Sequence, residues 1–435
     1  MTTSLLWFRR DLRLADHPAL CAAVASSDRV VPLFVLDPAL LRPAGANRVA
    51  FLLGALADLR RRTGGALRVV TGDPVEVVPR LAQGMDAVHV SSDHGPYGRA
   101  RDAAVAERVS LVATGSPYGV TPGRLVKADG SPYRVFTPFH KAWVAHGIRK
   151  PATEPTEIPW YDGGLPTEEL PAAAPTAALP EPTEAAALER WQDFRESRLS
   201  RYDDTRNTAD GTSRLSPYLR WGLLHPRTLH AGLGRSAGAQ AFGRELVWRD
   251  FYADVLWHQP RSAREDLAAL PLAYEEPGPS FDAWREGRTG FPYVDAGMRQ
   301  LRAEGWLPNR TRMVVASFLT KDLHLHWWHG ARHFMAHLVD GDLASNQHGW
   351  QWVAGTGTDA APYHRVFNPV LQGRAHDPHG DYVRRWVPEL RSVPDGAVHE
   401  PWTLADPPAG YPAPVVEHAR ERADALARYA AARGG

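Results

Sequence analysis

Two stretches of the chain place charged and aromatic side chains on one face of a predicted helix, because residues three and four apart share a side. The first stretch has the spacing i, i+3, i+4 and i+7 at Glu245, Trp248, Arg249 and Tyr252. The second stretch repeats this spacing at Asn309, Arg312, Met313 and Ala316. Such faces suit a pocket that both hydrogen-bonds and stacks a planar ligand. Taken singly, each face also suits an ordinary contact between helices.

The segment Trp350-Gln351-Trp352 is the sharpest local feature. Residues two apart on a helix diverge, so the two indoles are predicted to face different neighbours. One indole would then serve a bound cofactor and the other a stacked base. The alternative is a pair of core tryptophans.

Residues 211–219 concentrate small hydroxyl side chains beside a glycine, directly before a helical run. Hydroxyls and backbone N–H groups at a helix N-terminus form an anion site. An ordinary N-cap is the simpler interpretation of this segment.

Two further motifs fit their usual chemistry poorly. The stretch from Gly355 to Ala360 has the spacing of a dinucleotide fingerprint, but that motif needs a strand before it and a helix after it. A tryptophan-rich segment precedes it and Pro362 follows, so we expect no Rossmann site. Four histidines also cluster, at His324, His326, His329 and His333. The last two have zinc-ligand spacing, but no third ligand stands at a suitable distance, so we expect a structural cluster and no metal.

The first 130 residues alternate short apolar runs with amphipathic stretches. Buried strands are predicted at 5–8, 30–36, 67–71 and 87–91. Helices are predicted at 49–62 and at 74–83, the latter with Asp73 as N-cap and Pro74 at its first position. This alternation predicts an α/β domain with a doubly wound parallel sheet.

The chain changes character after this region. Residues 151–184 are rich in Pro, Ala, Thr and Glu, which is typical of a poorly structured connector. Beyond residue 185 helical periodicities dominate, and 12 of the 15 tryptophans lie there. We therefore expect an α/β domain at 1–130, a connector at 131–184 and a larger all-α domain at 185–435.

The composition sets limits on partners and location. The net charge is +1, with 46 arginines and four lysines, so only a local basic patch would indicate nucleic acid. The single cysteine, Cys21, excludes a disulfide framework and fits a reducing cytosol. The N-terminus lacks the apolar run of a signal peptide. No run reaches the ~18 apolar residues of a membrane helix. These features predict a cytoplasmic protein without a membrane partner.

Five ordered motifs together resemble the photolyase/cryptochrome family. They are Trp7-Phe8-Arg9-Arg10-Asp11-Leu12-Arg13, residues 211–219, Glu245 to Tyr252, Thr289 to Asp295, and Gly341 to Pro369. The resemblance runs from residue 4 to about 420 and is closest to the class I enzymes that repair cyclobutane pyrimidine dimers. It implies an α/β antenna domain and a helical domain that holds FAD in a U shape.

The resemblance implies a set of FAD-binding residues. Those that would hold the phosphates and the ribityl chain are Tyr202, Thr212, Ser213, Leu215 and Ser216. Those that would surround the flavin are Phe242, Arg312 paired with Asp340, Asp342, and Asn346 facing N5.

The resemblance also implies ultraviolet-damaged DNA as the substrate. The lesion pocket would comprise Glu245, Trp248, Asn309, Met313 and Trp352, with Arg206, Arg310 and Arg365 on the DNA backbone. A dimer within a duplex must be flipped out to reach the flavin. Trp248 and Trp352 would stack on it, and Glu245 would hydrogen-bond the base edges. Photoexcited reduced FAD would lend an electron to the dimer, the ring would split, and the electron would return.

Family members reduce their flavin through three tryptophans. Trp350 and Trp327 match the inner two positions, whereas Tyr274 stands at the outer one. A neighbouring glutamate, Glu275 or Glu276, would accept the phenolic proton; alternatively, Trp284 or Trp257 has taken over the outer step.

Several positions favour repair of cyclobutane dimers. Asn346 resembles the residue that photolyases have at this position. Pro308-Asn309 stands where the (6–4) enzymes carry paired histidines, and Met313 and Trp352 resemble the cyclobutane-dimer branch. A cryptochrome photoreceptor without repair activity is the alternative. A light-independent nucleotide-binding protein is a third possibility, which a colourless purified protein would favour.

Residues 93–102 occupy the region where the family binds a second, antenna chromophore. Their pattern is closer to the deazaflavin-binding than to the folate-binding type. The family is usually monomeric, so a monomer is expected.

Overall fold

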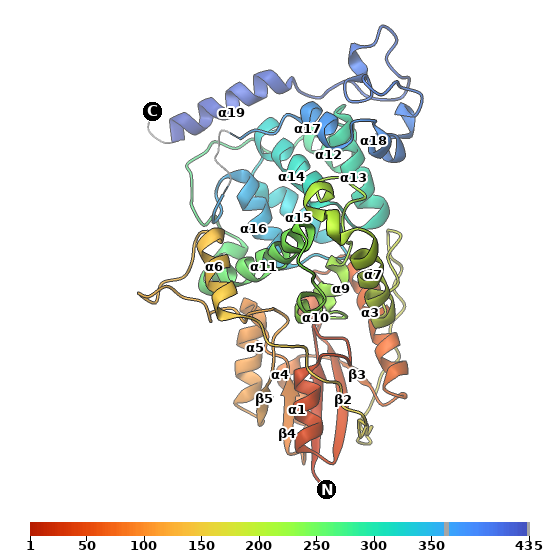
Figure 1. The fold of residues 1–435 in the computed structure, drawn as a ribbon, viewed down its shortest axis with the longest axis vertical. Helices are drawn as coiled ribbons and strands as arrows, with labels where there is room; N and C mark the ends of the chain where they lie inside the picture. Colours follow the sequence, from red (N-terminus) through yellow and green to blue (C-terminus); the bar gives the residue numbers. More distant parts are fainter. Residues whose placement is uncertain (361–364, 433–435) are drawn as a thin grey trace. The chain divides into compact units, whose positions relative to one another are not determined.

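Five parallel strands form a single sheet in the N-terminal part of the chain (Figure 1). The structure is a computed structural model, which describes residues 1–360 and 365–432. The strands are β1 (Thr3–Phe8), β2 (Arg29–Leu36), β3 (Arg68–Thr71), β4 (Ala87–Val90) and β5 (Leu111–Ala113), in the order β3-β2-β1-β4-β5. Leu5 of the central strand pairs with Val31 on one side and Val88 on the other. The predicted α/β class with a doubly wound parallel sheet is confirmed.

Helices connect these strands, as a parallel sheet requires. They are α1 (Pro18–Ser26), α2 (Pro38–Leu41), α3 (Ala46–Arg62), α4 (Pro74–Leu81), α5 (Pro96–Ala106) and, after the sheet, α6 (Phe136–His146). Asp73 caps α4 as predicted, since its Oδ1 accepts a hydrogen bond of 2.9 Å from the Val75 N–H. The four predicted strands are all present. The fifth, β5, was not predicted, because it is three residues long and two of them are exposed.

The chain folds into two compact units, which are described separately. The first unit comprises Met1–Pro175, Leu179–Arg201 and Ser213–Pro260. The second comprises Thr176–Ala178, Tyr202–Thr212 and the described residues from Arg261 onward. The sheet unit thus extends beyond the predicted boundary at residue 185. Helix α6 lies within the range 131–184 assigned to the connector, but no helix or strand occurs from residue 151 to Thr183.

The first unit also contains helices that follow this connector. They are α7 (Glu184–Ser197), η1 (Leu199–Arg201), α9 (Ser216–Trp221), α10 (Pro226–Ala231) and α11 (Ala237–His258). Helix α11 begins at Ser236, whose side chain accepts a hydrogen bond of 3.1 Å from the Ala239 N–H. Its 22 residues carry the first of the two faces noted in the sequence.

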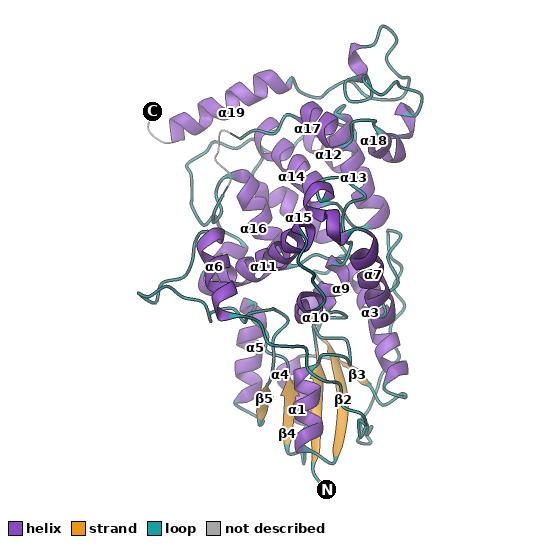
Figure 2. Cartoon of the chain, in the orientation of Figure 1, coloured by secondary structure: helices purple, strands orange, loops and turns teal. Residues whose placement is uncertain are grey.

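The regular elements among the described residues of the second unit are all helices, and Figure 2 shows the strands only in the sheet. The longer helices are α12 (Pro279–Glu286), α13 (Pro292–Glu304), α14 (Asn309–Ser317), α15 (Trp327–His337), α16 (Leu343–Ala354), α17 (Pro369–His376), α18 (Asp381–Trp386) and α19 (His418–Ala432). Shorter turns are α8 (Tyr202–Thr205), η2 (Pro260–Ala263), the π-helix η3 (Phe318–Asp322), η4 (Pro388–Leu390) and η5 (Pro401–Thr403). Among the described residues, no helix is long and apolar enough to cross a membrane.

The core of the second unit is built largely from aromatic rings. Trp284 and Trp327 have no exposed surface, and Phe334 and Trp350 are almost fully buried. Val314, Val315 and Leu319 belong to the same buried cluster. This core fixes α14, α15 and α16, which carry eight of the predicted site residues: Asn309, Arg310, Arg312, Met313, Trp327, Asn346, Trp350 and Trp352.

Candidate active site

The predicted site residues are divided between the two units. The first unit contains Ser213, Leu215, Ser216, Phe242, Glu245 and Trp248. The second contains Tyr202, Arg206, Thr212, Tyr274, Asn309, Arg310, Arg312, Met313, Trp327, Asp340, Asp342, Asn346, Trp350, Trp352 and Arg365.

Helix α16 carries two contrasting faces. Its N-terminus is capped by Asp342, whose Oδ1 accepts a hydrogen bond of 3.1 Å from the Ser345 N–H. One face, which includes Trp350, is buried in the core. The other face consists of Asn346, Gly349 and Trp352, which are spaced three apart and are all partly exposed. We call these three residues the open face of α16.

The two tryptophans of α16 have different surroundings, as their spacing predicts. The Trp350 ring lies 6.1 Å from Trp284 and 5.0 Å from Phe334, both edge-on. Gly330 of α15 approaches it so closely that a Cβ there would lie 2.1 Å from the indole. Trp352 is only partly buried. The indole of Trp350 therefore belongs to the core, whereas that of Trp352 is accessible.

The open face of α16 presents a hydrogen-bond acceptor on Asn346 and unoccupied space beside Gly349. The Asn346 amide donates to the Ala331 carbonyl at 3.2 Å and to Gln347 Oε1 at 2.8 Å. Its Oδ1 therefore remains as the acceptor. A Cβ placed on Gly349 would meet no heavy atom within 4 Å. Gly349 was not among the predicted site residues, although a glycine inside a helical pattern is itself a signal of close packing or function.

Arg312 and Asp340 form the predicted pair. Arg312 Nη2 donates to Asp340 Oδ2 at 2.7 Å, and Arg312 Nε donates to the Leu307 carbonyl at 2.9 Å. The other carboxylate oxygen, Asp340 Oδ1, is buried without a hydrogen-bond partner in the described structure. The same holds for Thr212 Oγ1. Buried polar atoms normally have partners, so these two fit a ligand with both donor groups and phosphate oxygens, as FAD has.

The first turn of α14 carries the second predicted face. Asn309 Nδ2 lies 3.7 Å from Met313 Sδ, and α14 packs against α16. Arg310 donates to Asn207 Oδ1 at 3.0 Å. Burial lowers the pKa of Arg310, and the positive charges of Arg206 and Arg365 lower it further. The three arginines predicted to contact DNA thus lie within electrostatic reach of one another.

The α11 face in the first unit is only partly available to a ligand. Phe242 is buried, with its ring 5.9 Å from Trp191 and 5.1 Å from Phe194. Trp248 stacks on Phe136 at 3.8 Å, which covers one side of its indole, and Glu245 is partly buried. Arg249, predicted to face the pocket, instead donates to the carbonyl of Pro117 at 2.7 Å. Its role there is a contact between segments of the chain.

The hydroxyl-rich segment before α9 does not cap that helix. The N-cap residue is Leu215, and no side chain makes a capping hydrogen bond. Ser213 Oγ accepts a weak hydrogen bond of 3.4 Å from the Leu215 N–H. Arg214 between them adopts a φ of +54°, a strained conformation for a residue with a side chain. The ordinary N-cap interpretation is therefore wrong.

The predicted electron relay lies within the second unit. Trp327 Nε1 donates to Asp266 Oδ1 at 2.6 Å, a contact that no local sequence pattern predicts. The His326 ring lies 5.5 Å from Trp327 and 4.8 Å from Tyr274. The Glu275 carboxylate, a predicted proton acceptor for Tyr274, already accepts a hydrogen bond of 2.6 Å from Arg428. Trp284 contacts Trp350 rather than the outer end of the relay.

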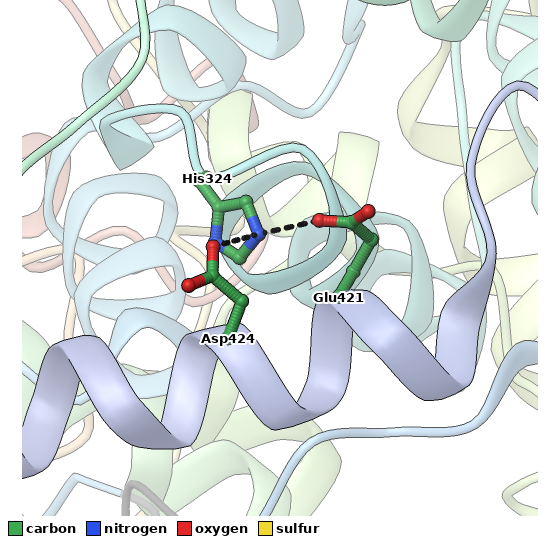
Figure 3. A group of neighbouring side chains, drawn as sticks. All are labelled: His324, Glu421 and Asp424. Carbon is green, nitrogen blue, oxygen red and sulfur yellow. Dashed lines mark hydrogen bonds and ion pairs between the residues drawn. The ribbon is translucent and has the colours of Figure 1, made fainter.

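The clustered histidines have structural surroundings. His333 lies against Trp284 and His337, and burial lowers its pKa to about 3. His324 instead joins Glu421 and Asp424 of α19 (Figure 3), with Nε2 2.9 Å and 3.4 Å from their carboxylates. Arg428 donates to the same Asp424 oxygen at 2.9 Å and supplies the positive charge that a cation would bring. We interpret this group as a contact that fastens α19.

The fingerprint-like stretch at Gly355 has the wrong context, as expected. Helix α16, not a strand, precedes it, and Gly355 ends that helix with a φ of +87°. Pro362, which the sequence analysis used, lies outside the described residues.

The antenna segment of the first unit is a network of paired charges. Arg101 bonds to Asp102 at 2.9 Å and Asp93 at 3.2 Å, and Arg9 bonds to Asp102 at 2.5 Å. Although burial opposes it, Arg101 and two further arginines lower the pKa of Asp93 to about 2. His94 differs from these residues, since both ring nitrogens are buried and lack a hydrogen-bond partner in the described structure. Its ring lies 5.6 Å from Trp257.

The buried oxygens of Thr212 and Asp340, which lack hydrogen-bond partners in the described structure, fit a protein whose helical unit binds a cofactor. Comparison with known families is specific. A model of the FAD binding domain of DNA photolyase matches residues 242–431, and a DNA photolyase model matches residues 4–158. Deoxyribodipyrimidine photo-lyase of Halobacterium salinarum is 40% identical, with 99% of each chain covered.

Solved structures agree with this assignment. A class III photolyase from Agrobacterium tumefaciens superposes with a TM-score of 0.93 at 34% identity, covering 100% of this chain and 98% of the other. The archaeal photolyase from Sulfolobus tokodaii, solved with two FAD molecules, has a TM-score of 0.86 at 30% identity, with 99% and 100% covered. The chain belongs to the photolyase/cryptochrome family. Within it, the chain is a DNA photolyase, a flavoprotein enzyme of DNA repair.

Proposed function

We propose that this enzyme repairs cyclobutane pyrimidine dimers in ultraviolet-damaged DNA under light. The observation that carries the proposal is the open face of α16, where an amide acceptor, a glycine and an accessible indole follow one another. Reduced FAD, held by the residues assigned below, would supply under light the electron that opens the dimer. The protein itself contributes binding, orientation and electrostatics.

The lesion pocket is assigned to Glu245, Trp248, Asn309, Met313 and Trp352. Trp352 stacks on the flipped dimer, and Trp248 does so with the side of its indole that Phe136 leaves uncovered. Asn309 and Met313 lie together at the start of α14 and supply a polar and an apolar contact. Glu245 hydrogen-bonds the base edges and stabilises the charge that develops on them.

FAD is assigned to Tyr202, Thr212, Ser213, Leu215, Ser216, Phe242, Arg312, Asp340, Asp342 and Asn346. The buried oxygens of Thr212 and Asp340 support this assignment, because a phosphate would accept from the hydroxyl and a flavin or ribityl group would donate to the carboxylate. Asn346 would present its Oδ1 to the N5–H of the reduced flavin.

Arg206, Arg310 and Arg365 are assigned to the DNA backbone. The crowding of these charges around Arg310 is unfavourable in the free protein and is relieved when a phosphate binds. The release of counterions would then make binding weaker as salt rises.

A second chromophore, of the deazaflavin or the folate type, is assigned to the segment 93–102. His94 supports this, because its buried ring nitrogens need a partner; the neighbouring Trp257 already has the Arg99 guanidinium over its ring at 3.5 Å. An excitation spectrum of flavin emission tests it, since an antenna adds a band that free FAD lacks. A spectrum of FAD alone would contradict the assignment.

The test of the main proposal is repair in vitro. The chemically reduced enzyme, mixed with an oligonucleotide carrying one thymine dimer, should restore intact thymines under blue light and not in the dark. A (6–4) lesion in the same sequence serves as the substrate control and should remain. Binding of FAD without repair of either lesion would instead support the photoreceptor alternative.

A further inference from the structure

A short π-helix interrupts the second unit directly after α14. In this turn, η3, the Leu323 N–H bonds to the Phe318 carbonyl five residues earlier, at 3.0 Å. Such turns are rare and often mark functional positions. Ser317, at the end of α14, and Lys321, in η3, lie about one helical turn apart. Both are buried, with 0% and 1% of their surface exposed.

Ser317 and Lys321 both bind the backbone of one distant segment. Lys321 Nζ donates to the carbonyl of Arg365 at 3.1 Å. The Phe367 N–H donates to Ser317 Oγ at 3.2 Å. The bound residues are two apart in a stretch without helix or strand, which leads into Asn368, the N-cap of α17. Two side chains therefore hold a stretch that has no secondary structure of its own.

The held segment carries one of the clustered arginines. Arg365 affects the pKa of Arg310 on α14, and also that of Lys321 itself. Placing Arg365 there brings like charges together, which costs free energy, so other contacts must hold the backbone of this segment against the repulsion. The contacts of Ser317 and Lys321 provide that fixation from a buried part of the core.

The use of lysine here is itself a signal, because the chain has 46 arginines and only four lysines. A lysine is a compact donor on a flexible stem that fits a single carbonyl, whereas an arginine carries a broad planar fork. A lysine therefore suits position 321, which is buried and binds one carbonyl oxygen, that of Arg365.

We propose that Ser317 and Lys321 are positioning residues for damaged DNA: by holding the backbone at Arg365 and Phe367, they keep Arg365 within electrostatic reach of Arg310, ready for the phosphates beside the lesion. This inference rests on the proposed function. It adds a pair of residues that do not themselves touch DNA but set the geometry of an arginine that does.

The proposal implies a pH dependence. Burial lowers the pKa of Lys321 to about 8; Asp322 beside it opposes this, and Arg365 adds to it. Asp322 is in turn paired with His418 of α19 and is influenced by His324 and Glu421. Because the depressed pKa leaves Lys321 charged below about pH 8 and neutral above, its hold on the Arg365 carbonyl weakens as pH rises through that value.

The experiment compares Lys321→Met, Ser317→Ala and the surface control Lys150→Met, which also removes one positive charge. Affinity for a dimer-containing oligonucleotide is measured from pH 6.5 to 9, together with the repair rate at saturating DNA. Lys321→Met should bind about tenfold more weakly at pH 7 because a buried hydrogen bond is lost. It should also lose the decline in affinity that the wild type shows above pH 8. Its repair rate, once DNA is bound, should be unchanged.

Ser317→Ala provides a test that does not need Lys321→Met to fold or the enzyme to repair dimers. Hydrogen exchange of the Phe367 amide in the FAD-loaded protein should become faster, while the Asn346 amide, bonded to Asp342, stays protected. Unchanged exchange at Phe367 would overturn the contact. Dimer affinity within twofold of wild type in both core variants would overturn the positioning role. A wild type that does not distinguish dimer-containing DNA would instead contradict the proposed function.

Discussion

The two faces of α16 carry the same side chain in opposite settings. Trp350 is enclosed by Trp284, Phe334 and Gly330 of α15, whereas Trp352, two residues later, packs against the core but stays partly exposed. An enclosed indole has fixed neighbours, which suits electron transfer along a defined path. An accessible indole can stack on a ligand that arrives from outside. Two tryptophans thus suit two purposes, because residues two apart on a helix point to different sides of it.

The strongest test of this comparison is Trp350→Phe. If the buried face carries the relay, photoreduction of oxidised FAD should be abolished, because phenylalanine is much harder to oxidise than tryptophan. Repair by the chemically reduced enzyme should be normal. Photoreduction is followed by the loss of flavin absorbance under blue light with an external reductant. Trp386→Phe, a half-buried tryptophan on α18, is the control. Unimpaired photoreduction in Trp350→Phe would remove that residue from the relay.

The opposite face is tested by Trp352→Ala. Loss of a stacking surface should weaken binding of dimer-containing DNA by roughly 1–3 kcal/mol per base. FAD content and photoreduction should remain, since Trp352 is outside the relay. A gel-shift or anisotropy titration at constant salt measures the affinity, and Trp386→Ala controls for the loss of a partly buried indole. Equal affinity for wild type and Trp352→Ala would show that this indole does not stack on the lesion.

Two glycines, Gly330 beside Trp350 and Gly349 on the open face, provide a third test of the difference between the two faces of α16. Gly330→Ala pushes a methyl group against Trp350, which should lower the free energy of unfolding by about 1–3 kcal/mol. Gly349→Ala meets no neighbour, so it should leave stability unchanged or raise it by about 1 kcal/mol through helix propensity. It should nevertheless weaken binding of dimer-containing DNA, because it narrows the open face. Urea unfolding of the FAD-loaded proteins separates the two, and equal unfolding free energies would contradict the assignment of the faces.

Much of this arrangement could be predicted from the sequence. The spacing of the apolar residues predicted β1 to β4 and α4. The two-residue step between Trp350 and Trp352 predicted that their indoles face different sides of the helix. What could not be predicted depends on segments far apart in the chain. Phe136 covers Trp248 across 112 positions, and Arg428 occupies the carboxylate of Glu275 across 153. Only packing reveals such pairs, because no local pattern of residue types specifies them.

The same limit applies to the site itself. Motif resemblance selected Thr212 and Asp340 individually, but not the fact that one oxygen of each is buried without a partner. It also passed over Ser317 and Lys321, which contact neither cofactor nor substrate in the proposed scheme. Residues that act through the backbone of another segment leave little trace in the local sequence.

The smallest expected effect belongs to Tyr274→Phe, at the outer end of the path that begins with Trp350. Tyr274 lies edge-on to His326 at 4.8 Å, and His326 lies beside Trp327, so the tyrosine can end the relay through this histidine. A tyrosine gives up an electron readily only if its proton leaves too. Glu275 is held by Arg428, which makes it a poor acceptor. The His326 ring is next to the phenol, but its Nδ1 accepts a hydrogen bond of 3.2 Å from the Trp328 N–H and its Nε2 lies 3.9 Å from Asp266 Oδ2.

Because Trp327 can still be oxidised without the tyrosine, Tyr274→Phe should slow photoreduction only partly, by a factor of about 2–5, which corresponds to about 0.4–1 kcal/mol in the barrier. The rate is measured as for Trp350→Phe, with Tyr161→Phe in the sheet unit as control. His326→Gln should slow photoreduction to a similar degree, and combining it with Tyr274→Phe should add little if both act in one step. Complete loss of photoreduction in Tyr274→Phe would make the tyrosine an obligatory donor. No effect of either change would place the outer end of the relay on another aromatic residue.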